Sequence, residues 1–289
     1  LRLAEDEFWF SISDSDLLLW LQGVNVTKKY DVEIDEIDVC PVQIQGPLSE
    51  DLMAKLAGEE LREIPYYGLM ETSIGGAEVV ISQTGFTGEK GYEIYVRDAH
   101  ENAEKVWNAV LEAGEEFGLM VIAPAHHRRI QAGILSWGQD LDHETSPFQV
   151  NLYYQVPRNK EADYIGKKEL ERQRDMIDAG EAPFKMRMVG MILGGKNITD
   201  YAPDFWLIAD TDGNDMGYIT SPWWSPELDT NVALGWVPWS SSEVGTKMQV
   251  RLPDEYSDSP GVPVDAEIVD VPFRESVTPN KREVEKAKG

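Results

Sequence analysis

The 289-residue chain is poor in the residues that build covalent cross-links and metal centres. It has one cysteine, Cys40, so a disulfide within the chain is excluded, as is typical of a cytoplasmic protein. Because Val39 and Val42 flank Cys40, we expect its thiol to be buried as a small hydrophobe rather than to act in catalysis. The histidines are His100, His126, His127 and His143. Their spacing fits no standard zinc site, so we predict no bound metal.

Basic residues are also scarce, with 26 Lys and Arg against 52 Asp and Glu and a net charge of -26. This balance argues against nucleic acid as a partner, since phosphate contacts need a surplus of Lys and Arg. The acidic residues are spread along the chain, which is typical of a solvated acidic surface or of adaptation to salt. An anionic ligand would need local positive groups, and Arg128–Arg129 and Lys167–Lys168 are candidates.

Long apolar runs and common catalytic signatures are missing as well. No stretch approaches the roughly 20 apolar residues of a membrane-spanning helix, so we predict no membrane partner. There is no phosphate-binding Walker loop, no dinucleotide-binding glycine motif after a strand, and no G-x-S-x-G. No signal peptide is visible, and the chain opens on Leu1 in a strand-like segment, so we expect a fragment or a processed start.

The first 180 or so residues mix strands with helices in the manner of an α+β domain. Predicted strands lie at 7–13, 30–38, 39–45, 68–74, 77–84 and 92–96. Predicted helices lie at 17–23, 49–56, 100–117 and 124–133. Asp14 and Asp16 are candidate N-caps of the first helix and Ser49 of the second, and Gly23 and Gly118 are expected to end the first and third.

From residue 186 onward the pattern is all-β, with short strand-like runs separated by turn residues, as in a barrel. Asp212-Gly213 predicts a hairpin there. We therefore predict a first domain at 1–182, a β-barrel domain at 183–280 and a charged tail at 281–289.

The segment SQTGFTGEKGYEIY at 82–95 is the most informative one for function. Its three glycines allow a tight turn or a close approach to a ligand. Glu93 follows within a strand, where alternation puts Tyr92 and Ile94 on one face and Glu93 and Tyr95 on the other. A carboxylate in a strand needs water, a cation or paired donors, so Glu93 either faces solvent or binds a ligand.

This segment resembles the S-R-T-G-Y-T-G-E-D-G-F-E-I motif of the glycine-cleavage T-protein family. Other stretches resemble family motifs in the same order, at 44–47, 129–133, 137–142, 145–147, 163–170, 217–235 and 271–273. The resemblance implies tetrahydrofolate bound in a central cavity, with a β-rich C-terminal domain packed against it. It also implies that the acidic residue at the family's reaction centre lies upstream of the first residue, so no catalytic residue is assigned.

The resemblance further implies which residues contact the folate. Glu93 matches the glutamate that hydrogen-bonds the pterin ring, and a carboxylate can accept two N–H groups at once. Tyr95, Phe86 and Ser13 are assigned to the same site. Arg129 matches the family's arginine, as a partner of Glu93 or of the folate.

Several positions depart from the general family pattern. Residues 9–16 (WFSISDSD) and 18–20 (LLW), with 195–198 (GKNI) and Asp200, are similar to dimethylsulfoniopropionate demethylases. Gln131 replaces the family's glutamate in R-L-E-A-G, and P-A-H at 124–126 replaces A-R-D. The branch resemblance favours methyl transfer to tetrahydrofolate from a small sulfonium or methoxy donor.

Two alternatives stay open. One is an aminomethyltransferase of glycine cleavage that acts on a lipoyl carrier protein, and the other is a folate-binding protein without catalysis, acting in regulation or repair. Five aromatic residues either line a pocket or fill the core, and we expect core: Trp137, Tyr153, Tyr154, Trp223 and Trp224.

Overall fold

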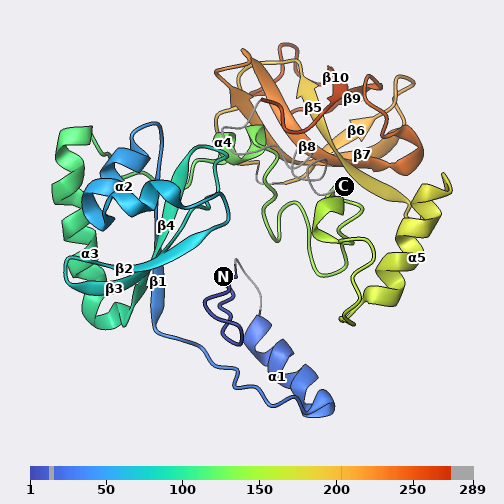
Figure 1. Cartoon of the computed structure of the whole chain (residues 1–289). Helices are drawn as coiled ribbons and strands as arrows, with labels where there is room; N and C mark the ends of the chain where they lie inside the picture. The colour runs from blue at the N-terminus through green and yellow to red at the C-terminus, as the bar shows by residue number, and fades with distance from the viewer. Residues whose placement is uncertain (13–15, 203, 275–289) are drawn as a thin grey trace. The chain divides into compact units, whose positions relative to one another are not determined.

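The computed structural model describes residues 1–12, 16–202 and 204–274. The chain divides into two compact units, Leu1–Ala123 and Pro124–Gly289, which are described one at a time (Figure 1). This division by compactness differs from the expected domain boundary between residues 182 and 183, which stays a prediction. Ser13, Asp14 and the charged tail at 281–289 lie outside the described residues.

The first unit is built on an antiparallel sheet with the strand order β1-β4-β3-β2. Its strands are β1 (Val39–Gln45), β2 (Leu69–Ile74), β3 (Ala77–Ser82) and β4 (Gly91–Arg97), close to the predicted segments. The main helices are α2 (Ser49–Ala57) and α3 (Ala99–Gly114), with short 3-10 turns at Glu59–Glu63 and Glu115–Phe117. Both helices lie against the same side of the sheet (Figure 1), where their apolar residues bury Ile44, Ile81 and Ile94.

Details of the two helices differ from expectation. Ser49 does not cap α2, because Leu48 holds the N-cap position and the Ser49 hydroxyl donates to the Lys90 carbonyl at 3.1 Å. On α3, the inner residues Val106 and Val110 are buried, whereas Trp107 is 39% exposed. Gly118 ends the turn after α3 with a φ of 67°, as expected of a left-handed stop.

The first 38 residues hold less regular structure than the pattern predicted. The strands expected at 7–13 and 30–38 are wrong: the described residues of the first form only an isolated pairing of Arg2 with Phe8, and the second pairs with no described strand. α1 (Leu17–Lys28) begins at its predicted cap, where the Leu19 amide donates to Asp16 at 3.1 Å. It continues through Gly23, where it was predicted to end, because a glycine within a helix costs only about 1 kcal/mol. It ends before Lys29, which has a left-handed backbone conformation.

The second unit contains a closed antiparallel barrel with the strand order β10-β5-β8-β7-β6-β9 (Figure 1). Its strands are β5 (Met186–Leu193), β6 (Trp206–Ala209), β7 (Asp215–Ser225), β8 (Thr230–Pro238), β9 (Lys247–Val250) and β10 (Val264–Val269). All lie in the region from residue 186 onward that was predicted to be all-β. Gly213, with a φ of 87°, lies in the expected turn between β6 and β7. The barrel prediction is confirmed.

Helical segments precede the barrel in this unit. They are α4 (His126–Gln131), a 3-10 turn at Tyr153–Gln155 and α5 (Lys167–Asp178), with a further 3-10 turn at Trp239–Ser241 after β8. The sequence had not indicated α5, whose one buried residue is Gln173. Within the described part of the chain, no helix combines the length and the apolar character that crossing a bilayer requires. The cytoplasmic location stays a prediction.

Candidate functional site

Glu93 lies in β4 on the sheet face opposite the helices. Its neighbours on either side, Tyr92 and Ile94, are both 0% exposed and belong to the core under α2 and α3. Across the sheet, Glu93 pairs with Gln43 of β1 and Ser82 of β3, so this face carries polar groups in register. The predicted alternation of the strand is therefore confirmed.

Two hydroxyl groups hold one oxygen of the Glu93 carboxylate. Thr84 Oγ1 and the Tyr95 hydroxyl both donate to Oε2, the latter at 3.2 Å. No hydrogen bond among the described residues ends on Oε1. A carboxylate with one oxygen anchored and the other open is fixed in direction and is ready to accept a donor from a ligand.

Tyr95 is 6% exposed and acts as a donor to Glu93. Burial and the Glu93 charge raise the pKa of its phenol to about 12, while a hydrogen bond with Ser11 opposes them. The phenol therefore keeps its proton at neutral pH. Phe86 lies in the glycine-rich turn and is 37% exposed, so its ring is available on the surface of the unit.

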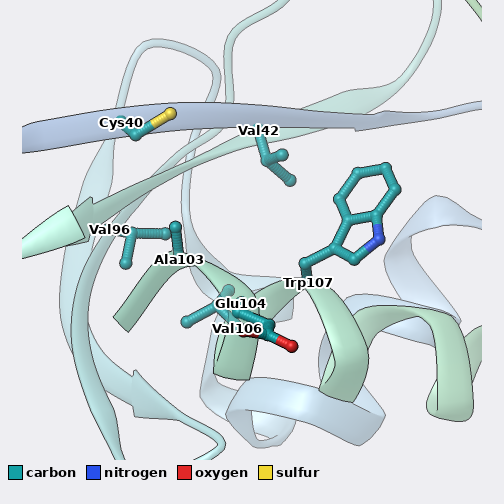
Figure 2. A pocket seen from close by; sticks show the side chains of 7 residues that line it. All are labelled: Cys40, Val42, Val96, Ala103, Glu104, Val106 and Trp107. Carbon is teal, nitrogen blue, oxygen red and sulfur yellow. The ribbon is translucent and has the colours of Figure 1, made fainter. Parts of the chain in front are cut away.

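An apolar cavity of about 370 Å³ opens on the other face of the same sheet (Figure 2). Cys40, Val42 and Val96 line it from the strands, and Trp107 lines it from α3. The prediction of a buried Cys40 is wrong, since the residue is exposed. Among the described strands, β1 pairs with β4 alone and so lies at the edge of the sheet, which leaves its side chains with fewer neighbours. The cavity is separate from the face that carries Glu93.

In the second unit, a buried ion pair joins Arg129 of α4 to Asp140. Arg129 is 0% exposed, and its Nη1 donates to Asp140 at 2.5 Å and to the Ile134 carbonyl at 3.2 Å. Asp140 also accepts from the hydroxyls of Thr220 and Ser221, each at 2.6 Å.

Burial lowers the pKa of Arg129, and the Asp140 charge opposes that effect. The guanidinium stays charged, since arginine does not lose its proton in proteins. Its Nη2 donates to Ser221 at 2.7 Å, so the group is engaged on several sides within its own unit. The role predicted for Arg129 toward Glu93 or folate stays a prediction. Asp140 was not singled out from the sequence, although it lies within the motif at 137–142.

His126, at the start of α4, is tied to this ion pair. Arg129 Nε donates to His126 Nδ1 at 3.1 Å, so the imidazole carries its proton on Nε2. Burial, together with the Arg129 charge, lowers the pKa of His126 to about 4. The ring is therefore neutral at physiological pH.

Three rings meet at this position, and the His126 imidazole is one of them. The centroid of His126 lies 4.1 Å from that of Tyr201, edge to face, and 5.9 Å from that of Trp223, nearly parallel. Tyr201 and Trp223 meet at 5.7 Å and 84°. The aromatic residues predicted to fill the core are only half-buried: Trp137, Tyr153, Tyr154, Trp223 and Trp224. Trp223 also packs against the core cluster that contains Ile130.

Comparison with known proteins places these features in a family. Residues 1–160 match the family model described as the GCVT N-terminal domain, and residues 187–274 match the glycine cleavage T-protein C-terminal barrel domain. The dimethylsulfoniopropionate demethylase DmdA of Ruegeria pomeroyi is 34% identical over 253 residues, covering 88% of this chain and 66% of that protein. An aminomethyltransferase of Geobacillus sp. is 28% identical, covering 86% of this chain and 69% of that protein.

A solved structure shares the fold. The glycine cleavage system aminomethyltransferase T from Bartonella henselae matches with a TM-score of 0.65 and 23% identity, over 89% of this chain and 66% of that one. The chain thus spans 66% of the length of both the demethylase and the solved aminomethyltransferase.

Proposed function

Since this chain belongs to the glycine cleavage T-protein family, we propose that it transfers a one-carbon group from a small methyl donor to tetrahydrofolate. The donor class is a sulfonium, such as dimethylsulfoniopropionate, or a methoxy compound. The observation that carries the folate part is the anchored carboxylate of Glu93, with Oε2 bonded to Thr84 and Tyr95 and Oε1 open. Tetrahydrofolate supplies the amine nitrogen that accepts the one-carbon group.

The residues around Glu93 fit a pterin edge, which presents adjacent N–H donors. Oε1 can accept such a donor directly, and Oε2 retains lone-pair capacity beside its two hydroxyl partners. Ser82 and Gln43 flank the carboxylate on the neighbouring strands and add polar groups to the same face. Phe86 and Tyr95 are proposed as further contacts of the folate. Ser13 is proposed as a contact too, on the basis of the sequence alone.

The branch resemblance favours methyl transfer over aminomethyl transfer, and the 34% identical demethylase supports the same choice. Methyl transfer from a sulfonium releases a neutral sulfide, so its leaving group needs no proton from the protein. A methoxy donor would need protonation of its oxygen. Binding both substrates in the right orientation would then be the main contribution of the chain.

The alternative is an aminomethyltransferase that acts on a lipoyl carrier protein, and it is favoured by the aminomethyltransferases among the relatives. An acidic carrier would need a basic landing surface. Three of the basic residues of the second unit are already engaged. Arg129 is buried against Asp140, Lys167 Nζ donates to the Lys160 carbonyl at 2.6 Å, and Arg187 donates to an Asn151 side chain at 2.6 Å. This supports a free small donor.

A binding experiment tests the folate part. Calorimetry with 5-formyltetrahydrofolate, a stable analogue, compares the chain with Glu93→Gln and with Glu78→Gln. Glu78 is an exposed carboxylate in β3 of the same sheet and serves as the matched control. We expect Glu93→Gln to weaken binding about 10- to 100-fold, since hydrogen bonds to a charged group contribute about 1.5–3 kcal/mol. Equal affinities for the chain and Glu93→Gln would contradict the proposed pterin contact.

Product analysis tests the donor. Methyl-tetrahydrofolate formed from a sulfonium or methoxy compound supports demethylation. Methylene-tetrahydrofolate and ammonia formed only from an aminomethyl-loaded carrier would establish the alternative, and folate binding without turnover would point to a non-catalytic protein.

A further inference from the structure

His126, Tyr201 and Trp223 form a group of three mutually contacting rings that we call the aromatic triad. His126 and Trp223 are nearly parallel, with an angle of 15° between their planes. Tyr201 stands almost perpendicular to both, at 85° and 84°. The triad is reachable from solvent, since Tyr201 is 54% exposed. Aromatic faces carry negative quadrupole potential, so such an arrangement attracts cations.

The surroundings of the triad do not cancel that attraction. Its imidazole is uncharged at physiological pH, because burial and then the Arg129 charge lower its pKa to about 4. The nearest guanidinium, that of Arg129, is neutralised by Asp140. The Asp200 carboxylate accepts from the Tyr201 amide at 2.7 Å and so adds negative charge beside the triad. The overall charge of -26 strengthens the field at longer range.

A cation without N–H groups suits this surface best. A sulfonium or quaternary ammonium cannot donate conventional hydrogen bonds, so a carboxylate gains no directional contact with it. The faces of aromatic rings bind such a cation through cation–π attraction. At this position the sequence has P-A-H at 124–126, where the family motif reads A-R-D. An aromatic ring thus takes the place of a charged side chain.

We propose that the aromatic triad binds the onium group, sulfonium or quaternary ammonium, of a small molecule. Where the proposed methyl transfer holds, the methyl donor is that molecule, so this inference deepens the proposed function and rests on it for its biological meaning. The binding itself requires neither folate nor turnover.

The test is a titration of the 289-residue chain without folate. Choline is compared with 3,3-dimethyl-1-butanol, which has the same shape and no charge, and trimethylsulfonium is compared with tetramethylammonium. Dissociation constants come from NMR line shapes and ring-current shifts of the probe methyl groups. We expect choline to bind about 5- to 30-fold more tightly than the alcohol, the range that cation–π contacts produce.

Three variants localise the binding. Tyr201→Leu should weaken choline binding about 5- to 30-fold, whereas Tyr201→Phe should leave it nearly unchanged. Phe205→Leu is the matched control, because Phe205 is 53% exposed and also stacks on another ring, that of Tyr218. Intermolecular NOEs from the probe to the ring protons of the triad give a readout that does not depend on any variant folding.

Equal binding of choline and the alcohol, or equal loss in Tyr201→Leu and Phe205→Leu, would overturn the proposal. A preference for either onium ion over the other leaves the site in place and identifies the donor chemistry. Failure of methyl transfer with onium binding intact would count against the proposed function alone. Failure of onium binding with folate binding intact would count against the triad alone.

Discussion

Replacing Asp140 with asparagine should destabilise the second unit strongly. Asp140 is 1% exposed and its partner Arg129 is 0% exposed. If one of the two charges is removed, water cannot reach the other to stabilise it. Asp140→Asn keeps the shape and one acceptor oxygen but leaves the buried guanidinium without its counter-ion. Breaking a buried pair in this way costs about 3–5 kcal/mol, most of which is the cost of the uncompensated charge.

The hydrogen bonds around the pair refine this magnitude. In Arg129→Met, the Asp140 carboxylate still accepts from the hydroxyls of Thr220 and Ser221 and from the Ser136 amide at 2.8 Å. We therefore expect Arg129→Met to lie at the lower end of the same range. The double variant removes both charges together, so its loss should be smaller than the sum of the single losses by about 1–3 kcal/mol.

Urea unfolding, followed by tryptophan fluorescence and by far-UV circular dichroism, measures the three free energies. Arg251→Met is a suitable control, because Arg251 forms an exposed pair with Asp215 at 2.9 Å and exposed pairs contribute little. The reasoning holds that removing one partner leaves the other as an uncompensated buried charge. A loss of unfolding free energy below about 1 kcal/mol in Asp140→Asn, or additive losses in the double variant, would refute it.

Three further predictions concern single side chains. Thr84→Val should weaken 5-formyltetrahydrofolate binding about 5-fold by freeing Glu93, while Thr84→Ser, which restores the hydroxyl, should not; calorimetry that ranks both variants equally would contradict this. The imidazole of His126 should titrate by NMR with a pKa of about 4, against 6.5 in the unfolded chain. The unfolded state then binds the proton first as the pH falls, so stability is lost between pH 6.5 and about 4, and the pH dependence of unfolding should weaken in His126→Gln. Exposed Cys40 should react fully with a thiol reagent such as dithiobis(nitrobenzoate) in the folded protein; labelling only in denaturant would show that it is covered.

Regular elements with a buried face were predictable, because burial leaves a periodic pattern in the sequence. β4 shows this well: Tyr92 and Ile94 alternate with Glu93 and Tyr95, and the structure places the two pairs on opposite faces. The predicted strand at 30–38 also alternates, but it pairs with no described strand. Alternation specifies the two faces of a strand, whereas a strand also needs a hydrogen-bonding neighbour, which local sequence does not reveal.

Elements without a buried stripe were harder to predict. α5 has only three apolar residues among twelve, Leu170, Met176 and Ile177, and its one buried residue, Gln173, is polar, so its apolar pattern is sparse. Cys40 failed in the opposite way. Its apolar neighbours indicated burial, but its place on an edge strand depends on the strand order of the sheet.

The sites divide along the same line. Glu93 could be proposed from the sequence because its signal is local, a charged residue inside a strand after a glycine turn. The partners of Asp140 are 80 and 81 residues away at Thr220 and Ser221, so the hydrogen-bonded group exists only after β7 has been placed. The aromatic triad has the same origin, since His126, Tyr201 and Trp223 come from separate segments of the second unit.

The two proposed binding surfaces select ligands by opposite properties, and this bears on how an acidic protein could handle both substrates. Glu93 is negative and has an open acceptor, so it favours a pterin edge through its N–H donors. The aromatic triad has a neutral imidazole and ring faces, so it favours a cation that offers no N–H donor. An onium donor at Glu93 would leave Oε1 without a directional partner, and the ring faces of the triad offer the N–H groups of a pterin weaker acceptors than the Glu93 carboxylate does. Hydrogen-bonding capacity, rather than net charge, would therefore keep the two substrates in their own places.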